Sequence, residues 1–85
     1  MEKYIKPLQV YLDDNYSDTF GVIIGGYTFD LVVFDKRNYN KIMIISTYEY
    51  DDKDFEINLF EKCPCKFIDG IIRCLKDFDN GQNDE

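Results

Sequence analysis

The chain has 85 residues, of which 45% are hydrophobic, and a formal net charge of −7 from 17 acidic and 10 basic residues, with no histidine. This length is enough for one small core but not for a separate substrate-binding domain. The negative charge argues against nucleic acid as a direct ligand and favours a basic protein partner.

The N-terminal segment has no apolar run behind a basic region, as a secretory signal would have. No stretch of the sequence approaches the roughly 18–20 consecutive apolar residues of a membrane span. We therefore expect a cytoplasmic protein that makes no membrane contact.

Apolar residues recur at helical spacing between positions 4 and 12, which predicts an N-terminal helix. Pro7 is tolerated only in the first turn, because further along it would remove a hydrogen bond and clash with the preceding turn. The helix is thus expected to begin close to Pro7, and residues 13–18 are expected to form a loop.

Two hairpins are predicted next. Residues 19–24 and 27–34 are rich in β-branched and aromatic side chains, and only Gly25 and Gly26 separate them, which indicates a tight two-residue turn. Residues 41–50 and 55–60 form the second hairpin, joined by 51–54, and the polar residues 35–40 connect the hairpins. These loop lengths pair Val22 with Phe29, Val33 with Ile42, and Tyr48 with Ile57.

This register gives the predicted sheet one largely apolar face and one mixed face. The mixed face is either covered by one of the helices, closed by a homodimer, or exposed for binding another protein. Across it, Glu49 is expected to oppose Glu56 as a like-charge pair. The mixed face comprises Ile23, Thr28, Asp30, Val32, Phe34, Met43, Ile45, Thr47, Glu49, Glu56, Asn58 and Phe60.

Residues 64–79 carry an apolar stripe at helical spacing, with Pro64 in the expected first turn and Asn80-Gly81 as the expected stop. The sequence therefore predicts an α+β fold: a four-stranded antiparallel β-meander with an N-terminal and a C-terminal helix, in the order αββββα. Residues 1–81 are expected to form one domain and residues 82–85 a disordered tail.

Cys63, Cys65 and Cys74 are interpreted as reduced, structural thiols rather than a metal or redox site. Zinc needs four ligands, the chain has no histidine, and a Cys-Pro-Cys spacing is unusual for a zinc site. Without a near-neutral base, a nucleophile–base pair or a phosphate loop, we expect no catalytic residues, no metal and no cofactor. The protein is not expected to be an enzyme.

The strongest candidate for a binding site is the acidic hairpin, residues 48–56, in which five carboxylates are expected to gather around one hairpin tip. Tyrosine supplies rigid contact area, and carboxylates receive lysine and arginine in charge-assisted bonds. The alternatives are a merely solvated turn and a calcium loop, although the segment lacks the spaced oxygen ligands and glycine of an EF-hand. The predicted partner-binding residues are Tyr48, Glu49, Tyr50, Asp51, Asp52, Asp54 and Glu56, with Asp30 on the rim of the mixed face.

In size and acidity, the chain resembles two classes of protein: phage anti-CRISPR inhibitors, and toxin-immunity proteins that neutralise nuclease toxins. The resemblance is one of composition and includes no shared motif. It implies an inhibitor of a basic, nucleic-acid-processing protein. DNA mimicry is compatible, because alternate strand residues are about 6.6 Å apart, close to two phosphate steps of about 3.4 Å. The alternative hypothesis is a homodimeric structural or assembly accessory protein that uses the mixed sheet face.

Overall fold

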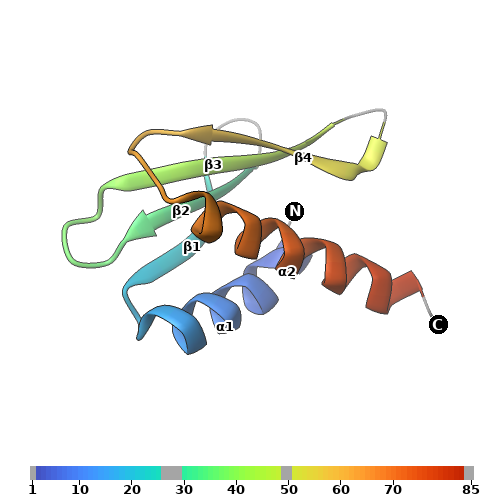
Figure 1. Cartoon of the computed structure of the whole chain (residues 1–85), viewed down its shortest axis with the longest axis horizontal. Helices are drawn as coiled ribbons and strands as arrows, with labels where there is room; N and C mark the ends of the chain where they lie inside the picture. The colour runs from blue at the N-terminus through green and yellow to red at the C-terminus, as the bar shows by residue number, and fades with distance from the viewer. Residues whose placement is uncertain (1, 26–29, 49–50, 84–85) are drawn as a thin grey trace.

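The computed structural model describes residues 2–25, 30–48 and 51–83, and of residues 47, 48, 51–54, 82 and 83 it describes the backbone alone. The sheet is antiparallel with strand order β1-β2-β3-β4, and both helices lie on one side of it (Figure 1). This confirms the predicted αββββα fold. The elements are η1 (Glu2–Tyr4), α1 (Ile5–Tyr16), β1 (Phe20–Gly25), β2 (Asp30–Asp35), β3 (Lys41–Tyr48), β4 (Asp51–Leu59) and α2 (Cys65–Asn83).

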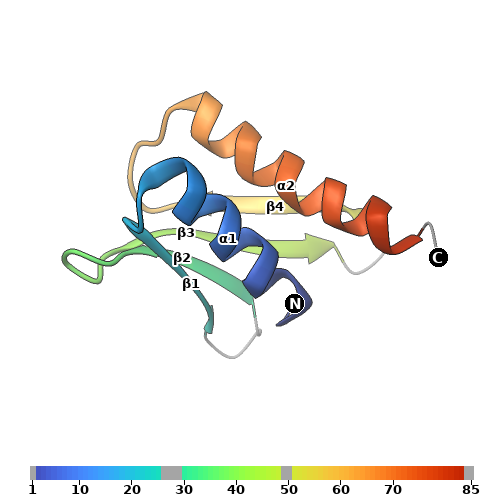
Figure 2. The same ribbon diagram turned by 90° about the horizontal axis from the view of Figure 1, so that it is seen from below.

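The core lies between the two helices and one face of the sheet. In the view from below, α1 and α2 lie side by side in front of the strands (Figure 2). Of the three alternatives for the mixed face, cover by one of the helices is therefore wrong. The core side chains are Tyr4, Leu8 and Leu12 from the N-terminal helices, Val22, Leu31, Val33, Ile42, Met43 and Ile45 from the sheet, and Phe67, Ile71 and Leu75 from α2.

Helix α1 has Pro7 in its first turn, as expected, but it continues through the predicted loop to Tyr16. The extra turn brings the ring of Tyr16 against Phe20 and Phe67, with centroid distances of 5.6 and 5.0 Å. Ser17 then ends the helix in the left-handed conformation, at φ 52°. Aromatic packing thus extends the helix across a segment whose polar residues suggested a loop.

Helix α2 also runs further than predicted and continues through Asn80-Gly81 to Asn83. Its last turns are held by the N-terminus of the chain. The Tyr4 hydroxyl donates a 2.6 Å hydrogen bond to Asp79, and the Tyr4 ring packs edge-on against Phe78. These contacts fix the turn of α2 that precedes Asn80-Gly81.

The first hairpin differs from the predicted one. Gly25 belongs to β1 and pairs with Asp30, so the predicted two-residue turn at Gly25-Gly26 is wrong. Residues 26–29 lie outside the residues that the structure describes. Val22 pairs with Val33 instead of Phe29, a shift of four residues that keeps each side chain on its predicted face. The register places Phe34 opposite Gly21, where the absence of a side chain leaves room for the ring.

A β-bulge turns β3 over relative to the prediction. Val33 pairs with Met43 rather than Ile42, because the register shifts between Val33 and Phe34, leaving Ile42 as the extra residue. Both Ile42 and Met43 are buried. The bulge moves Met43 and Ile45 from the predicted mixed face into the core.

The predicted register of the second hairpin is also wrong. Ile57 pairs with Ile45 instead of Tyr48, and Thr47 pairs with Phe55. Residues 51–54 belong to β4 rather than to a connecting loop, because Tyr48 pairs with Asp51, and the register shift between Thr47 and Tyr48 leaves residues 52–54 as extra residues in β4. Glu56 pairs with Ser46, so the predicted opposition of Glu49 and Glu56 does not form.

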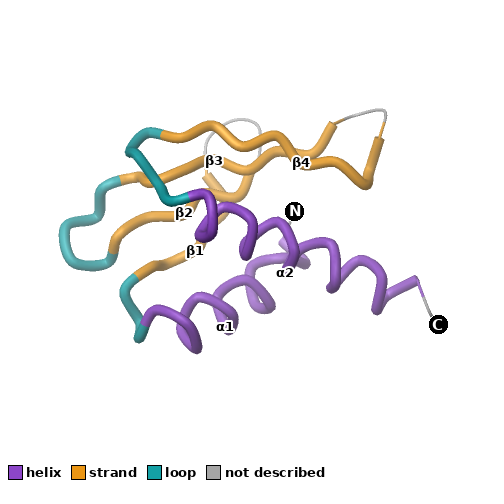
Figure 3. Tube along the Cα trace, in the orientation of Figure 1, coloured by secondary structure: helices purple, strands orange, loops and turns teal. Residues whose placement is uncertain are grey.

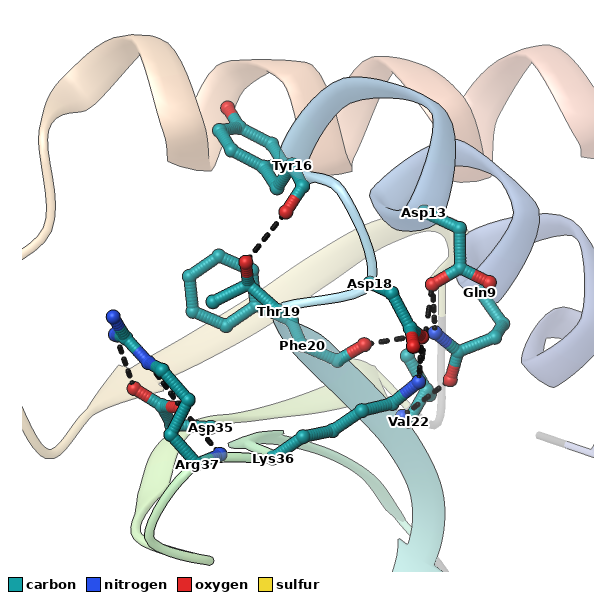
Figure 4. A network of polar contacts seen from close by, with 10 residues as sticks. All are labelled: Gln9, Asp13, Tyr16, Asp18, Thr19, Phe20, Val22, Asp35, Lys36 and Arg37. Atoms are coloured by element: carbon teal, nitrogen blue, oxygen red, sulfur yellow. Dashed lines mark hydrogen bonds and ion pairs between the residues drawn. The ribbon is translucent and has the colours of Figure 1, made fainter.

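The β2–β3 connection is organised by the buried carboxylate of Asp35 (Figure 4). It accepts hydrogen bonds from the backbone N–H of Arg37 at 2.9 Å and from the Arg37 Nε and Nη2 atoms at 3.0 and 2.7 Å. The hydrogen bonds from Arg37 hold the pKa of Asp35 below its ordinary value. The loop therefore depends on an ionised carboxylate.

Gly21→Val should destabilise the protein by about 1–3 kcal/mol although valine favours strands, because a Cβ at this position overlaps the Phe34 ring. Urea unfolding measures the effect. In a Phe34→Ala background the cost should largely disappear, and Gly81→Ala, with open space around it, should be neutral or stabilising by at most about 1 kcal/mol. An equal cost in both backgrounds contradicts the packing explanation.

Asp35→Asn should cost stability at neutral pH and progressively less in acid. The folded-state pKa of Asp35 is lowered, so its stabilisation is complete above the ordinary value of 3.8 and is lost as the pH falls through the folded value. Urea unfolding of both proteins at about pH 6 and about pH 2.5 measures this difference. Arg37→Gln should show the same convergence, whereas a pH-independent difference contradicts this role for Asp35.

Candidate functional site

The sheet face opposite the helices, here called the open face, carries an apolar row across three strands. Ile23 pairs with Val32, and Val32 pairs with Ile44. Val32 is only 4% exposed although neither helix covers it, whereas Ile23 is 49% exposed. The described side chains of the open face are Ile23, Asp30, Val32, Phe34, Ile44, Ser46, Glu56 and Asn58.

Two aromatic groups extend this apolar surface. The ring of Tyr39, which is 80% exposed, stacks on Phe34 with a centroid distance of 6.3 Å. Tyr39 has a positive φ of 61°, so the β2–β3 loop turns sharply where it presents this ring. Phe60, which follows β4 directly, is also exposed. Exposed apolar side chains grouped in this way are typical of protein-binding surfaces.

Two of the predicted site residues, Asp30 and Glu56, lie on the open face. Glu56 is exposed and pairs with Ser46 in β3. Asp30 is half-buried and lies one position before Leu31, whose partner Ile45 is the neighbour of Ser46. Asp30 in β2 and Glu56 in β4 therefore lie on either side of β3. Their backbones are two strand spacings, or about 10 Å, apart.

The remaining predicted site residues belong to the acidic hairpin. Tyr48 ends β3 and pairs with Asp51, the first residue of β4. Asp52 and Asp54 lie further along β4, and for these four residues the description covers the backbone alone. Glu49 and Tyr50 lie outside the described residues. The clustering of these side chains stays a prediction.

Gln9, which the sequence analysis did not single out, binds part of the outer edge of β1 (Figure 4). Its Nε2 donates to the Phe20 carbonyl at 2.8 Å, and its Oε1 accepts from the Val22 N–H at 2.9 Å. The same Nε2 contacts Asp13 at 2.9 Å. One side-chain amide thus satisfies both a donor and an acceptor on the outer edge of β1. The only sequence signal is a polar residue next to the buried Leu8.

A second polar group ties α1 to the sheet. Lys36, just after β2, donates to Asp18 and lies 3.9 Å from Asp13. The hydrogen bond to Lys36 lowers the pKa of Asp18. Two acidic residues of the Asp13–Asp18 segment are therefore occupied by an internal cation, which leaves them less suited to receive a basic partner.

Two of the three cysteines, Cys63 and Cys74, are partly buried, and Cys65 is exposed. All three cysteines are free, and burial raises the pKa values of Cys63 and Cys74, which favours the unreactive protonated form. Among the side chains that the structure describes, which leave out residues 47–54, no group of acidic and cysteine residues is placed to hold a metal ion. Within residues 2–25, 30–48 and 51–83, neither helix has the length and apolar character needed to cross a membrane.

Comparison of the chain with protein-family models, with curated proteins and with solved structures gives no match in any of the three. The functional interpretation therefore depends on the surface of the molecule itself.

Proposed function

We propose that this protein binds and inhibits a basic, nucleic-acid-processing partner protein in the cytoplasm, in the manner of a toxin-immunity protein or an anti-CRISPR inhibitor. The observation that carries the proposal is the open face. Neither helix covers it, and its exposed apolar side chains are accompanied by carboxylates on a chain of net charge −7. Binding rather than catalysis is the proposed activity.

The apolar and acidic parts of this surface have different roles. Ile23 and Phe60 are large, exposed side chains that would lose contact with water in a complex, which slows dissociation. Asp30, Glu56 and the acidic hairpin attract a cationic surface over longer distances, which mainly accelerates association.

Inhibition follows if the partner uses the same cationic surface to bind nucleic acid. Alternate positions of a regular strand are about 6.6 Å apart, close to two phosphate steps of about 3.4 Å, and β4 has acidic residues at the alternate positions Asp52, Asp54 and Glu56. Carboxylates at such positions compete with phosphates for lysine and arginine side chains. DNA mimicry on β4 is therefore the proposed route to inhibition.

A second candidate is a homodimeric structural or assembly protein whose copies meet through the open face. The exposure of Ile23 and Phe60 favours it, because apolar side chains of this size are commonly buried in dimer interfaces. Light scattering of the purified chain distinguishes the candidates, since the homodimer requires a doubled mass and the inhibitor does not.

Replacing Asp51 and Asp52 together with lysine should slow association with the partner about tenfold or more at low ionic strength, because it reverses charge in the acidic hairpin. The matched control is Asp69→Lys with Asp77→Lys, the same charge change on exposed residues of α2.

The immobilised wild-type chain is first used to isolate a basic protein from cells of its source, which mass spectrometry identifies. Association rates of that purified protein with both double variants are then measured at two salt concentrations, together with its nucleic-acid-processing activity. The proposal expects salt-sensitive binding, inhibition of activity, and a loss confined to the hairpin variant. Failure to retain any basic protein, or an equal loss in both variants, contradicts it.

A further inference from the structure

The two edges of the sheet differ in how their backbone groups are satisfied. The trace in Figure 3 shows β1 and β4 at opposite sides of the sheet, in agreement with the strand order. An unpaired edge offers a row of N–H and C=O groups that another strand can bind. On β1, the Gln9 amide occupies the outward Phe20 carbonyl and Val22 N–H. This edge is therefore partly closed to an added strand.

The outward groups of β4 follow from its pairing with β3. The Phe60 N–H donates to the Ile42 carbonyl at 2.9 Å, and Asn58 pairs with Ile44 in the same register. Since the backbone groups of successive strand residues point in alternate directions, those of Ile57 and Leu59 point away from β3. Among the described residues, no backbone group of a helix or loop hydrogen-bonds to these two. Leu59 is also 45% exposed.

The charge of β4 selects the kind of strand that suits this edge. Residues 51–59 carry four carboxylates and one lysine, a net charge of −3. A strand bearing lysine or arginine complements this charge, and opposite charges on adjacent strands stabilise pairing. A second copy of β4 brings the same negative charge, from a molecule of net charge −7, and is disfavoured.

We propose that the outer edge of β4 binds an extended, lysine- or arginine-bearing segment of the partner protein as a fifth strand of the sheet. The inference rests on the proposed function and specifies how the partner is held. Main-chain hydrogen bonds to Ile57 and Leu59 hold the segment, and its basic side chains select the acidic strand. The added strand also extends the open face beyond Glu56 and Asn58.

The experiment uses the full chain and a short synthetic peptide of alternating lysine and valine. The control peptide has the same sequence with N-methyl groups on two adjacent central residues, so that both of its edges are blocked at unchanged charge. Hydrogen exchange of the chain is followed by NMR. The unmodified peptide should slow exchange of the Ile57 and Leu59 amides about tenfold or more, and the methylated peptide should not. The Val22 amide, bonded to Gln9, should change little.

Leu59→Pro and Leu59→Ala test the same edge by mutation. Proline removes the outward backbone N–H of residue 59. Alanine shortens the side chain but retains this N–H. Leu59→Pro should bind the unmodified peptide about tenfold more weakly than Leu59→Ala. Circular dichroism establishes whether both variants fold, and exchange in the wild-type chain tests the proposal independently of them.

Several outcomes overturn the proposal. Equal, salt-sensitive binding of both peptides without protection of Ile57 and Leu59 rejects the edge but leaves an acidic binding surface intact. Protection that grows with protein concentration in the absence of peptide assigns the edge to a second copy. Absence of peptide binding rejects strand addition. The inhibitor function is tested separately, by the binding and activity measurements on the captured partner protein.

Discussion

Apolar packing of two helices against the same face of a four-stranded sheet is the constraint on which the other properties of this protein depend. Leu8 and Leu12 of α1 and Ile71 and Leu75 of α2 are fully buried in one shared core. Burying such side chains is the main favourable contribution to folding in a small domain. Because both helices contribute to this core, the opposite face of the sheet has no cover within the described chain.

The open face has an apolar centre, and acidic residues lie on it and along the neighbouring edge strand. Val32 is buried at this centre between its strand partners Ile23 and Ile44. Some of the carboxylates are paired within the molecule. Asp35 accepts a hydrogen bond from Arg37, and Asp18 accepts one from Lys36. Asp30, Glu56 and the acidic residues of β4 lie on the open face and along the edge strand beside it. This distribution is the basis on which we propose a cationic protein surface as its partner.

The sequence was sufficient to predict the fold but not the details of the sheet. The order of the elements followed from hydrophobic periodicity and turn residues, and the faces of β1, β2 and β4 were predicted correctly. The face of β3 was wrong because a bulge at Ile42 shifts the alternation by one residue, and counting along a strand cannot detect such an insertion.

The candidate site was predictable only in part, for the same reason. Asp30 and Glu56 could be placed on one face because the alternation holds in their strands. The supposed partner of Glu56 could not, because its position depended on an assumed loop length. The role of Gln9 depends on how α1 packs beside β1, a tertiary contact with no periodic signal in the sequence.

The central claim is tested most directly by NMR of isoleucine methyl groups in the presence of a soluble paramagnetic reagent. Ile23 on the open face is 49% exposed, whereas Ile45 and Ile71 are fully buried in the core. If the open face is available, the Ile23 methyl groups relax strongly and those of Ile45 and Ile71 do not. Equal protection of all three residues in dilute solution would mean that the face is covered, and would contradict the account.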